Sequence, residues 1–336
     1  MTHNHKHKIV GFWSVMFALL GNFSIGCLKF VGFTISGSSA LFAESIHSLA
    51  DTMNQALLMV GIKRSIKTAD EAHSYGYGQE RFFWALVSAC GIFFLGAGVT
   101  IYNGIATLRH PESVSISPII FVILAVSFII ESGTFWVAWR ELRSSDMEAS
   151  VGELLRDGDP TTIAVIYEDG VALLGVVTAF ASIALYMITG NHYWDGIGSI
   201  VIGGMLAVVA VLLINKNRQF LMKKAIPENV KEEIIELLEA EPVIERVVDF
   251  KSSILDVGAY HVRCEVEFNG AHLLKEMQAN LKDDFEEIDG DFEEFKKFAV
   301  RYIDRVPRIV GQRINQIEEK IQKQVPAILH IDIEIN

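Results

Sequence analysis

Residues 38 to 62 read SSALFAESIHSLADTMNQALLMVGI, an apolar stretch with three ionisable side chains in its middle. The stretch is long enough to cross a bilayer, since a transmembrane helix needs about 20 mostly apolar residues. Glu44, His47 and Asp51 are three and then four residues apart, so a helix places all three on one face. Ionisable groups at membrane depth are costly and usually face the interior of a helix bundle or an ion path. The stretch therefore predicts a polar site inside a membrane domain.

The chain has five more apolar segments, and its charge lies elsewhere. Of its 336 residues 51% are hydrophobic, and residues 225–336 hold 14 basic against 25 acidic residues, which is nearly all of the formal charge of −12. We expect six membrane spans, at about residues 9–33, 38–62, 82–108, 116–140, 161–189 and 193–215. The predicted domains are a polar head (1–8) with His3, His5 and His7, a six-span domain (9–215) and an acidic domain (216–336).

Lysine and arginine predict the orientation. They gather in the head, in the loops after the second and fourth spans, and after the sixth span. The positive-inside rule then puts both termini in the cytoplasm, and the lack of a targeting extension favours a bacterial inner membrane. Lys29 is expected to extend to the interface near the outer end of the first span. Asp195 is expected to cap the helix of the sixth span, whereas Glu131 either lines a path or pairs with another helix.

The acidic domain has the pattern of a small α+β sandwich. The predicted order is α-β-β-α-β. It consists of a helix at 228–239, strands at 243–251 and 260–268, a helix at 273–323 with a possible break at Pro307, and a closing strand ILHIDIEI. This order suggests a ferredoxin-like fold, with a helical insertion at about 275–310. His330 and Asp332 share one face of the closing strand, and with His261 they are candidates for a regulatory metal site, although no clear partner pattern accompanies them.

The fifth span supplies partners for the second. Residues 159–177 read DPTTIAVIYEDGVALLGVV, in which Glu168 and Asp169 point about 100° apart on a helix, so both need not face one site. Asp169 is the preferred inward ligand, because small residues follow it. With His47 and Asp51, and with Glu168 or water as the fourth ligand, it would form a nitrogen and oxygen site that suits zinc. The alternative is an interhelical ion cluster without metal.

With these residues in place, the chain resembles the cation diffusion facilitator family of proton-coupled zinc transporters. The resemblance rests on HSLAD (47–51), HSYGYGQER (73–81), Asp169, YWDGIGSIVIG (193–203) and the terminal HIDIEI, and GSSALFAESIHSLADTMNQ looks most like the ZnT9-type branch. It implies a homodimer of six-span protomers with a cytoplasmic ferredoxin-like domain. It also implies zinc export from the cytosol in exchange for protons, by alternating access.

One position departs from that family pattern. Zinc carriers of the family usually have a second His four residues before the span-five Asp, and here that residue is Val165. Glu168 or water would then complete the site, and manganese, iron or cobalt become alternative cargoes. Glu44 is a candidate to accept a hydrogen bond from a metal ligand or to lie on the proton route, with a role in bundle packing as the alternative. Asn54 is either near the site or part of an interhelical hydrogen bond.

Other function classes fit the sequence less well. An intramembrane metallohydrolase would need a signature such as HExxH, which the sequence lacks, so we expect no enzyme. The acidic surface argues against nucleic acid as a partner, and we expect no organic cofactor. Metal ions, protons, the bilayer and a second copy are the expected partners. A metal sensor or scaffold without transport is the alternative, because the second His is missing.

Overall fold

The computed structural model describes residues 12–111, 114–115, 117–145, 160–275, 285–286, 288 and 290–336. Two compact units divide the chain, Met1–Leu221 and Met222–Asn336. The predicted head with His3, His5 and His7 and part of the predicted insertion (276–284) lie outside the described residues.

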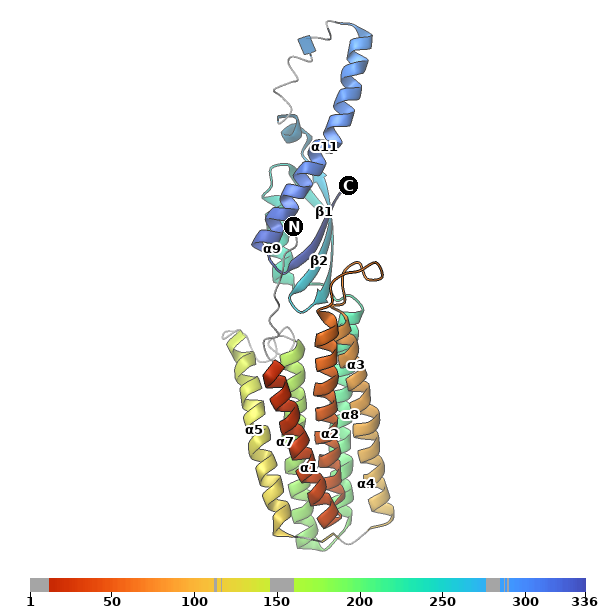
Figure 1. The fold of residues 1–336 in the computed structure, drawn as a ribbon, viewed down its shortest axis with the longest axis vertical. Coiled ribbons are helices and arrows are strands. Elements are labelled where there is room, and N and C mark those ends of the chain that lie inside the picture. The colour runs from red at the N-terminus through yellow and green to blue at the C-terminus, as the bar shows by residue number, and fades with distance from the viewer. Residues whose placement is uncertain are drawn as a thin grey trace. The chain divides into compact units, whose positions relative to one another are not determined.

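The described part of the first unit is a bundle of long helices (Figure 1). One continuous helical segment, Glu80–Arg109, consists of α3 (Glu80–Gly91), the π-helix η1 (Ile92–Gly98) and α4 (Val99–Arg109). The other helices of the bundle are α1 (Phe12–Ser36), α2 (Ser39–Ser65), α5 (Pro118–Ser145), α7 (Pro160–Thr189) and α8 (Tyr193–Leu221). Each of the six predicted apolar segments thus corresponds to one helical segment, with ends that differ by a few residues.

Five of these segments are long and apolar enough to cross a membrane, and α2 is the exception. The ionisable residues in its middle lower its hydropathy, yet α2 packs against α1, α3, α7 and α8. The bundle surface is apolar, with large exposed side chains such as Phe94, Ile129, Trp136 and Ile188. Because an exposed apolar surface of this extent marks a membrane contact, the bundle is a membrane domain with its polar helix inside.

Glycines let the helices of the bundle approach closely. A Cβ on Gly104 of α4 would lie 2.8 Å from the carbonyl oxygen of Gly196 in α8, closer than side-chain carbons come to backbone. Small residues at helix interfaces permit this packing in membranes, where no hydrophobic driving force acts between helices.

Asp195 caps a different helix from the one we predicted. It lies in the first turn of α8 and is only 1% exposed, but its carboxylate accepts hydrogen bonds from the N-terminus of α2. The donors are Ser38 Oγ (2.5 Å), Ser39 N (2.5 Å) and Ala40 N (3.2 Å). The prediction was wrong because the spare N–H groups that attract a carboxylate are those of the neighbouring helix.

The second unit contains α9 (Glu228–Glu239), β1 (Ile244–Asp256), β2 (Ala259–Phe268), α11 (Phe292–Gln324) and β3 (Ile328–Ile335). Its sheet has the order β1-β2-β3, antiparallel between β1 and β2 and parallel between β2 and β3. Ile234 and Leu238 of α9, Val262 of β2 and Ile321 of α11 are buried. The predicted α-β-β-α-β order and small α+β fold are confirmed.

The possible break at Pro307 is absent, because α11 runs through this residue. A proline inside a helix removes one hydrogen bond and leaves the carbonyl four residues earlier without its usual donor. Here Pro307 is exposed, and Ile303, which carries that carbonyl, is 69% exposed. Water can therefore bind the carbonyl, and the helix continues.

Candidate metal site

The predicted ligand pair on α2 is formed, with His47 buried and Asp51 17% exposed. His47 is 1% exposed, and its Nε2 lies 3.1 Å from Oδ2 of Asp51, one turn further along the helix. Nδ1 of His47 is also buried and has no hydrogen-bond partner among the described residues. A buried nitrogen without a partner is rare in folded proteins and points to a missing ligand or water.

The two acids on α7 have different surroundings. Both oxygens of Glu168 accept a hydrogen bond from Nδ2 of Asn54 on α2, at 2.7 Å, and Oδ1 of Asn54 accepts one from Ser88 Oγ at 2.6 Å. Asp169 lies within electrostatic reach of Asp51 and His47, and its buried Oδ2 has no hydrogen-bond partner in the described part of the chain. The structure thus fixes Glu168 to α2 and leaves an oxygen of Asp169 available to bind a ligand.

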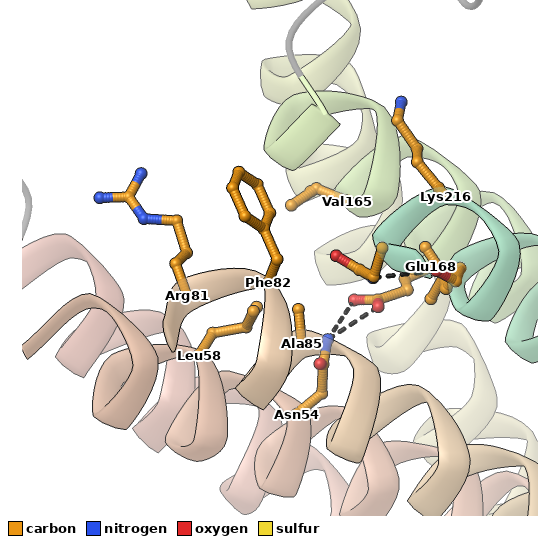
Figure 2. A pocket seen from close by; sticks show the side chains of 10 residues that line it. Asn54, Leu58, Arg81, Phe82, Ala85, Val165, Glu168 and Lys216 are labelled. Carbon is orange, nitrogen blue, oxygen red and sulfur yellow. Dashed lines mark hydrogen bonds between the residues drawn. The ribbon is translucent and has the colours of Figure 1, made fainter. Parts of the chain in front are cut away.

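A cavity of about 50 Å³ opens beside Glu168 between α2, α3, α7 and α8. Figure 2 shows the bonds from Asn54 to Glu168 at this cavity, with the charged ends of Arg81 and Lys216 turned away from the carboxylate. The volume is enough for a few water molecules. The lining residues are Asn54, Leu58, Arg81, Phe82, Ala85, Val165, Glu168, Leu213, Lys216 and Asn217. Val165, at the position where related carriers usually have His, is therefore part of the cavity wall beside Glu168.

The predicted ligands do not close around a metal position in this structure. Among the described His, Cys, Asp and Glu side chains, no group of three or more is placed to hold a metal ion. His47 and Asp51 form a close pair, while Glu168 is bound to Asn54. A four-ligand site from these residues requires the α7 acids to move relative to α2.

Glu44, one turn before His47, belongs to an ion cluster that sequence analysis missed. Nζ of Lys29 on α1 lies 2.7 Å from Glu44 Oε2 and 2.6 Å from Oε1 of Glu131 on α5. Lys29 is 0% exposed, so the prediction that it extends to the interface was wrong. Its ammonium finds two carboxylates inside the bundle, which stabilises the charge better than a reach toward the headgroups. A lysine in an apolar segment, with unassigned acids in two others, was the available signal.

The second unit brings its predicted metal candidates to one place on the sheet. His261 of β2 is paired in register with His330 of β3, their ring centroids are 6.3 Å apart, and His261 Nε2 lies 2.9 Å from Asp332 Oδ2. Burial, followed by the nearby His261, lowers the pKa of His330 below its ordinary value, while Asp332 acts in the opposite direction. Among the described residues of this unit, too, no three side chains are placed to hold a metal ion. The arrangement is a hydrogen-bonded His261–Asp332 pair beside a second histidine.

The apolar helices surround a polar helix with buried ionisable side chains, which is the arrangement of a multi-pass membrane protein. The chain belongs to the cation efflux family: the model of the cation efflux transmembrane domain matches residues 15–222. This match and the relatives that align over 96% of the chain confirm the resemblance to the cation diffusion facilitators.

Relatives from plants and animals align over almost the whole chain. It is 34% identical over 333 residues to metal tolerance protein C4 of Arabidopsis thaliana, with 96% of this chain and 72% of that protein covered. It is 32% identical over 330 residues to the human protein named mitochondrial proton-coupled zinc antiporter SLC30A9, covering 96% of this chain but 58% of that protein. A cation-efflux pump, FieF of Cronobacter sakazakii, is 22% identical over 231 residues, 67% of this chain and 70% of that pump.

Proposed function

We propose that the chain exchanges a divalent metal ion, zinc first, for protons across a membrane, with His47, Asp51 and Asp169 as ligands. The observation that carries the proposal is the close His47–Asp51 pair on a polar helix inside an apolar bundle, facing acids on α7. The name of the human relative, a proton-coupled zinc antiporter, supports this activity, and the name of the plant relative, a metal tolerance protein, supports metal as the cargo. Imidazole nitrogen with carboxylate oxygen suits zinc, and Glu168 or water completes the set.

Proton exchange follows from the charges of these ligands. With His47 neutral, the carboxylates of Asp51 and Asp169 give a formal charge that one divalent ion cancels. Without the ion, a proton on His47 and another on Asp169 would cancel it equally well. Because a net charge inside a bilayer is costly, exchange of one metal ion for about two protons is favoured, since it keeps the summed charge of His47, Asp51 and Asp169 at zero in both states, with Glu168 outside this sum.

The direct test is metal uptake into proteoliposomes with an imposed pH gradient. Zinc flux in the wild type should follow the gradient. Asp51→Ala and Asp169→Ala should each lower the flux more than about 100-fold, because each removes a metal ligand and not merely a residue that supports a ligand. Glu334→Ala, which removes a half-exposed carboxylate of the second unit, is the matched control and should transport normally. Flux that survives in both ligand variants would overturn the assignment.

The cavity wall gives a sharper test of metal choice. Val165→His would place an imidazole beside Glu168, as in the usual two-His site, and should raise the preference for zinc over manganese. Glu168→Gln keeps the hydrogen bond to Asn54 possible but removes a carboxylate ligand. Unchanged zinc affinity in Glu168→Gln would make water the fourth ligand. Competition assays with zinc, manganese, iron and cobalt read out both variants.

A sensor or scaffold without transport is the second candidate, favoured by the open arrangement of the ligands in this structure. It predicts metal binding to the purified protein with no flux in the wild type. Within the transport proposal, α2 also crosses the membrane, which makes six spans, both termini are cytoplasmic, and two copies assemble. Cysteine labelling of loops in sealed vesicles tests the orientation, localisation of a tagged chain tests the bacterial inner membrane, and light scattering of the purified protein tests the dimer.

A further inference from the structure

The ion cluster of Lys29, Glu44 and Glu131 is separate from the proposed metal ligands. It joins three helices, α1, α2 and α5, and its bonds of 2.7 Å and 2.6 Å run between the Lys29 ammonium and the two carboxylates. Lys29 and Glu44 are 0% exposed and Glu131 is 8% exposed. The proposed metal site does not by itself give these three residues a role in binding or transport.

The cluster has one negative charge too many. Two ionised carboxylates against one ammonium leave a formal charge of −1 in the apolar bundle, where an uncompensated charge is costly. Two of its oxygens, Glu44 Oε1 and Glu131 Oε2, are buried and have no hydrogen-bond partner among the described residues. One proton on either carboxylate would make the cluster neutral.

Two oxygens of the cluster are candidates for the proton. Glu44 Oε1 rests against α7, where a Cβ on Gly175 would be 2.2 Å away, so the glycine makes room for this oxygen. Glu131 Oε2 belongs to the less enclosed of the two carboxylates. Because both carboxylates bind the same ammonium, one proton on either of them leaves the same neutral cluster.

The other charged groups nearby do not cancel the excess. Lys29, Glu44 and His47 act electrostatically on Glu131, and Asp169 of α7 is a further acid in range. A protonated His47 is adjacent to Asp51, at 3.1 Å, and is compensated by it. When metal binds, His47 must lose its proton, so it cannot neutralise the cluster in both states.

We propose that Lys29, Glu44 and Glu131 form a proton-binding site in which the two carboxylates share one proton whether or not metal is bound. The neutral cluster links α1, α2 and α5 one turn from His47. The protons exchanged for metal then come from the metal ligands alone, and this part of the proposal rests on the proposed function. The presence of the proton does not rest on it.

Infrared difference spectroscopy of the purified full chain in lipid counts protonated carboxyl groups directly. Glu131→Gln should remove one protonated-carboxyl band relative to the wild type. Glu44→Gln should remove one as well, because Glu131 must then ionise to pair with Lys29. The band should not shift when zinc is added to the wild type. Since the two substitutions are nearly isosteric and lie on different helices, either one suffices if the other does not fold.

Two results would overturn the proposal. The first is that neither variant lacks a protonated-carboxyl band of the wild type, which would mean that both carboxylates are ionised in the wild type. The second is loss, on addition of zinc, of the band that Glu131→Gln removes, as distinct from the band of Asp169, or release of one proton fewer per zinc bound by Glu131→Gln in unbuffered solution; either would make this proton an exchanged one. Zinc flux in proteoliposomes is measured separately, so a failed transport proposal is recognised by absent flux with the band intact.

Discussion

Ion pairs in the helical bundle and in the C-terminal unit differ in number, burial and consequence. The bundle holds Lys29 between two carboxylates with 0% of its side chain exposed. The sheet of the second unit carries pairs such as Arg246–Glu267 and Arg263–Glu334, with Arg263 50% and Glu334 45% exposed. The residue types and distances are alike, and only the surroundings differ.

The difference shows where a charge in this protein has a structural or chemical task. In water an ion pair replaces good hydration with a similar interaction, so its loss changes little. Inside the bundle each charge must be paired, protonated or bound to a metal, and removal of one partner exposes the cost of the other. Function is therefore expected from the few buried charges and not from the many on the acidic unit.

The largest loss of stability is expected for Lys29→Met. It leaves Glu44 and Glu131 buried without a cation, which should lower the free energy of unfolding by about 3 to 5 kcal/mol. Denaturation of the purified chain in detergent, followed by tryptophan fluorescence, measures it. The double variant Lys29→Met with Glu44→Gln should recover most of the loss, because a protonated Glu131 is then neutral. Equal stability of the single variant and the wild type would contradict the pairing.

A smaller loss is expected for Asp195→Ala. The carboxylate caps the N-terminus of α2 with bonds of 2.5 Å, 2.5 Å and 3.2 Å, and loss of a helix cap costs about 0.5 to 2 kcal/mol. Asp195→Asn keeps an acceptor and should retain more of the stability. The same denaturation experiment compares them, and identical losses in both variants would show that the charge, not the hydrogen bonds, is what matters.

Arg263→Ala should have no measurable effect on the unfolding midpoint. The pair with Glu334 is short, at 2.6 Å, and Glu334 raises the pKa of the guanidinium, but both side chains are largely in water. Thermal unfolding at low and at high salt is the measurement. A clear loss at low salt that disappears at high salt would show that surface pairs of this unit contribute to its stability after all.

The smallest effect concerns pH. Burial and His261 hold the pKa of His330 below its ordinary value of 6.5, so the unfolded chain binds more protons than the folded chain just below that pH. The stability contributed by neutral His330 is therefore complete above pH 6.5 and declines as the pH falls toward the folded pKa. His330→Gln should remove this decline. Ring titration by NMR reads the pKa directly, and Asp332→Asn should lower it further.

Sequence periodicity was sufficient for most of the elements, because burial repeats with the helix or strand period. The single helix predicted at 273–323 was wrong in its extent, since Gly290 and Asp291 lie outside any helix and α11 begins at Phe292. The six apolar segments, the helix at 228–239 and the alternating strands all correspond to elements of the structure. Periodicity also put His47 and Asp51 on one face of a helix, and the structure confirms their contact. It failed at Pro307, because solvent exposure of the freed carbonyl is not visible in a sequence.

The sequence by itself therefore determined the class of protein, the polar helix inside a membrane bundle and the α+β unit, since these depend on local spacing and composition. Only the tertiary structure decided which distant groups meet. Lys29 pairs with Glu131 over 102 positions, Asn54 with Glu168 over 114, and Asp195 with Ser38 over 157. Such partners depend on helix packing, in which a glycine such as Gly175 sets the approach, and buried charges take whichever partner that packing supplies.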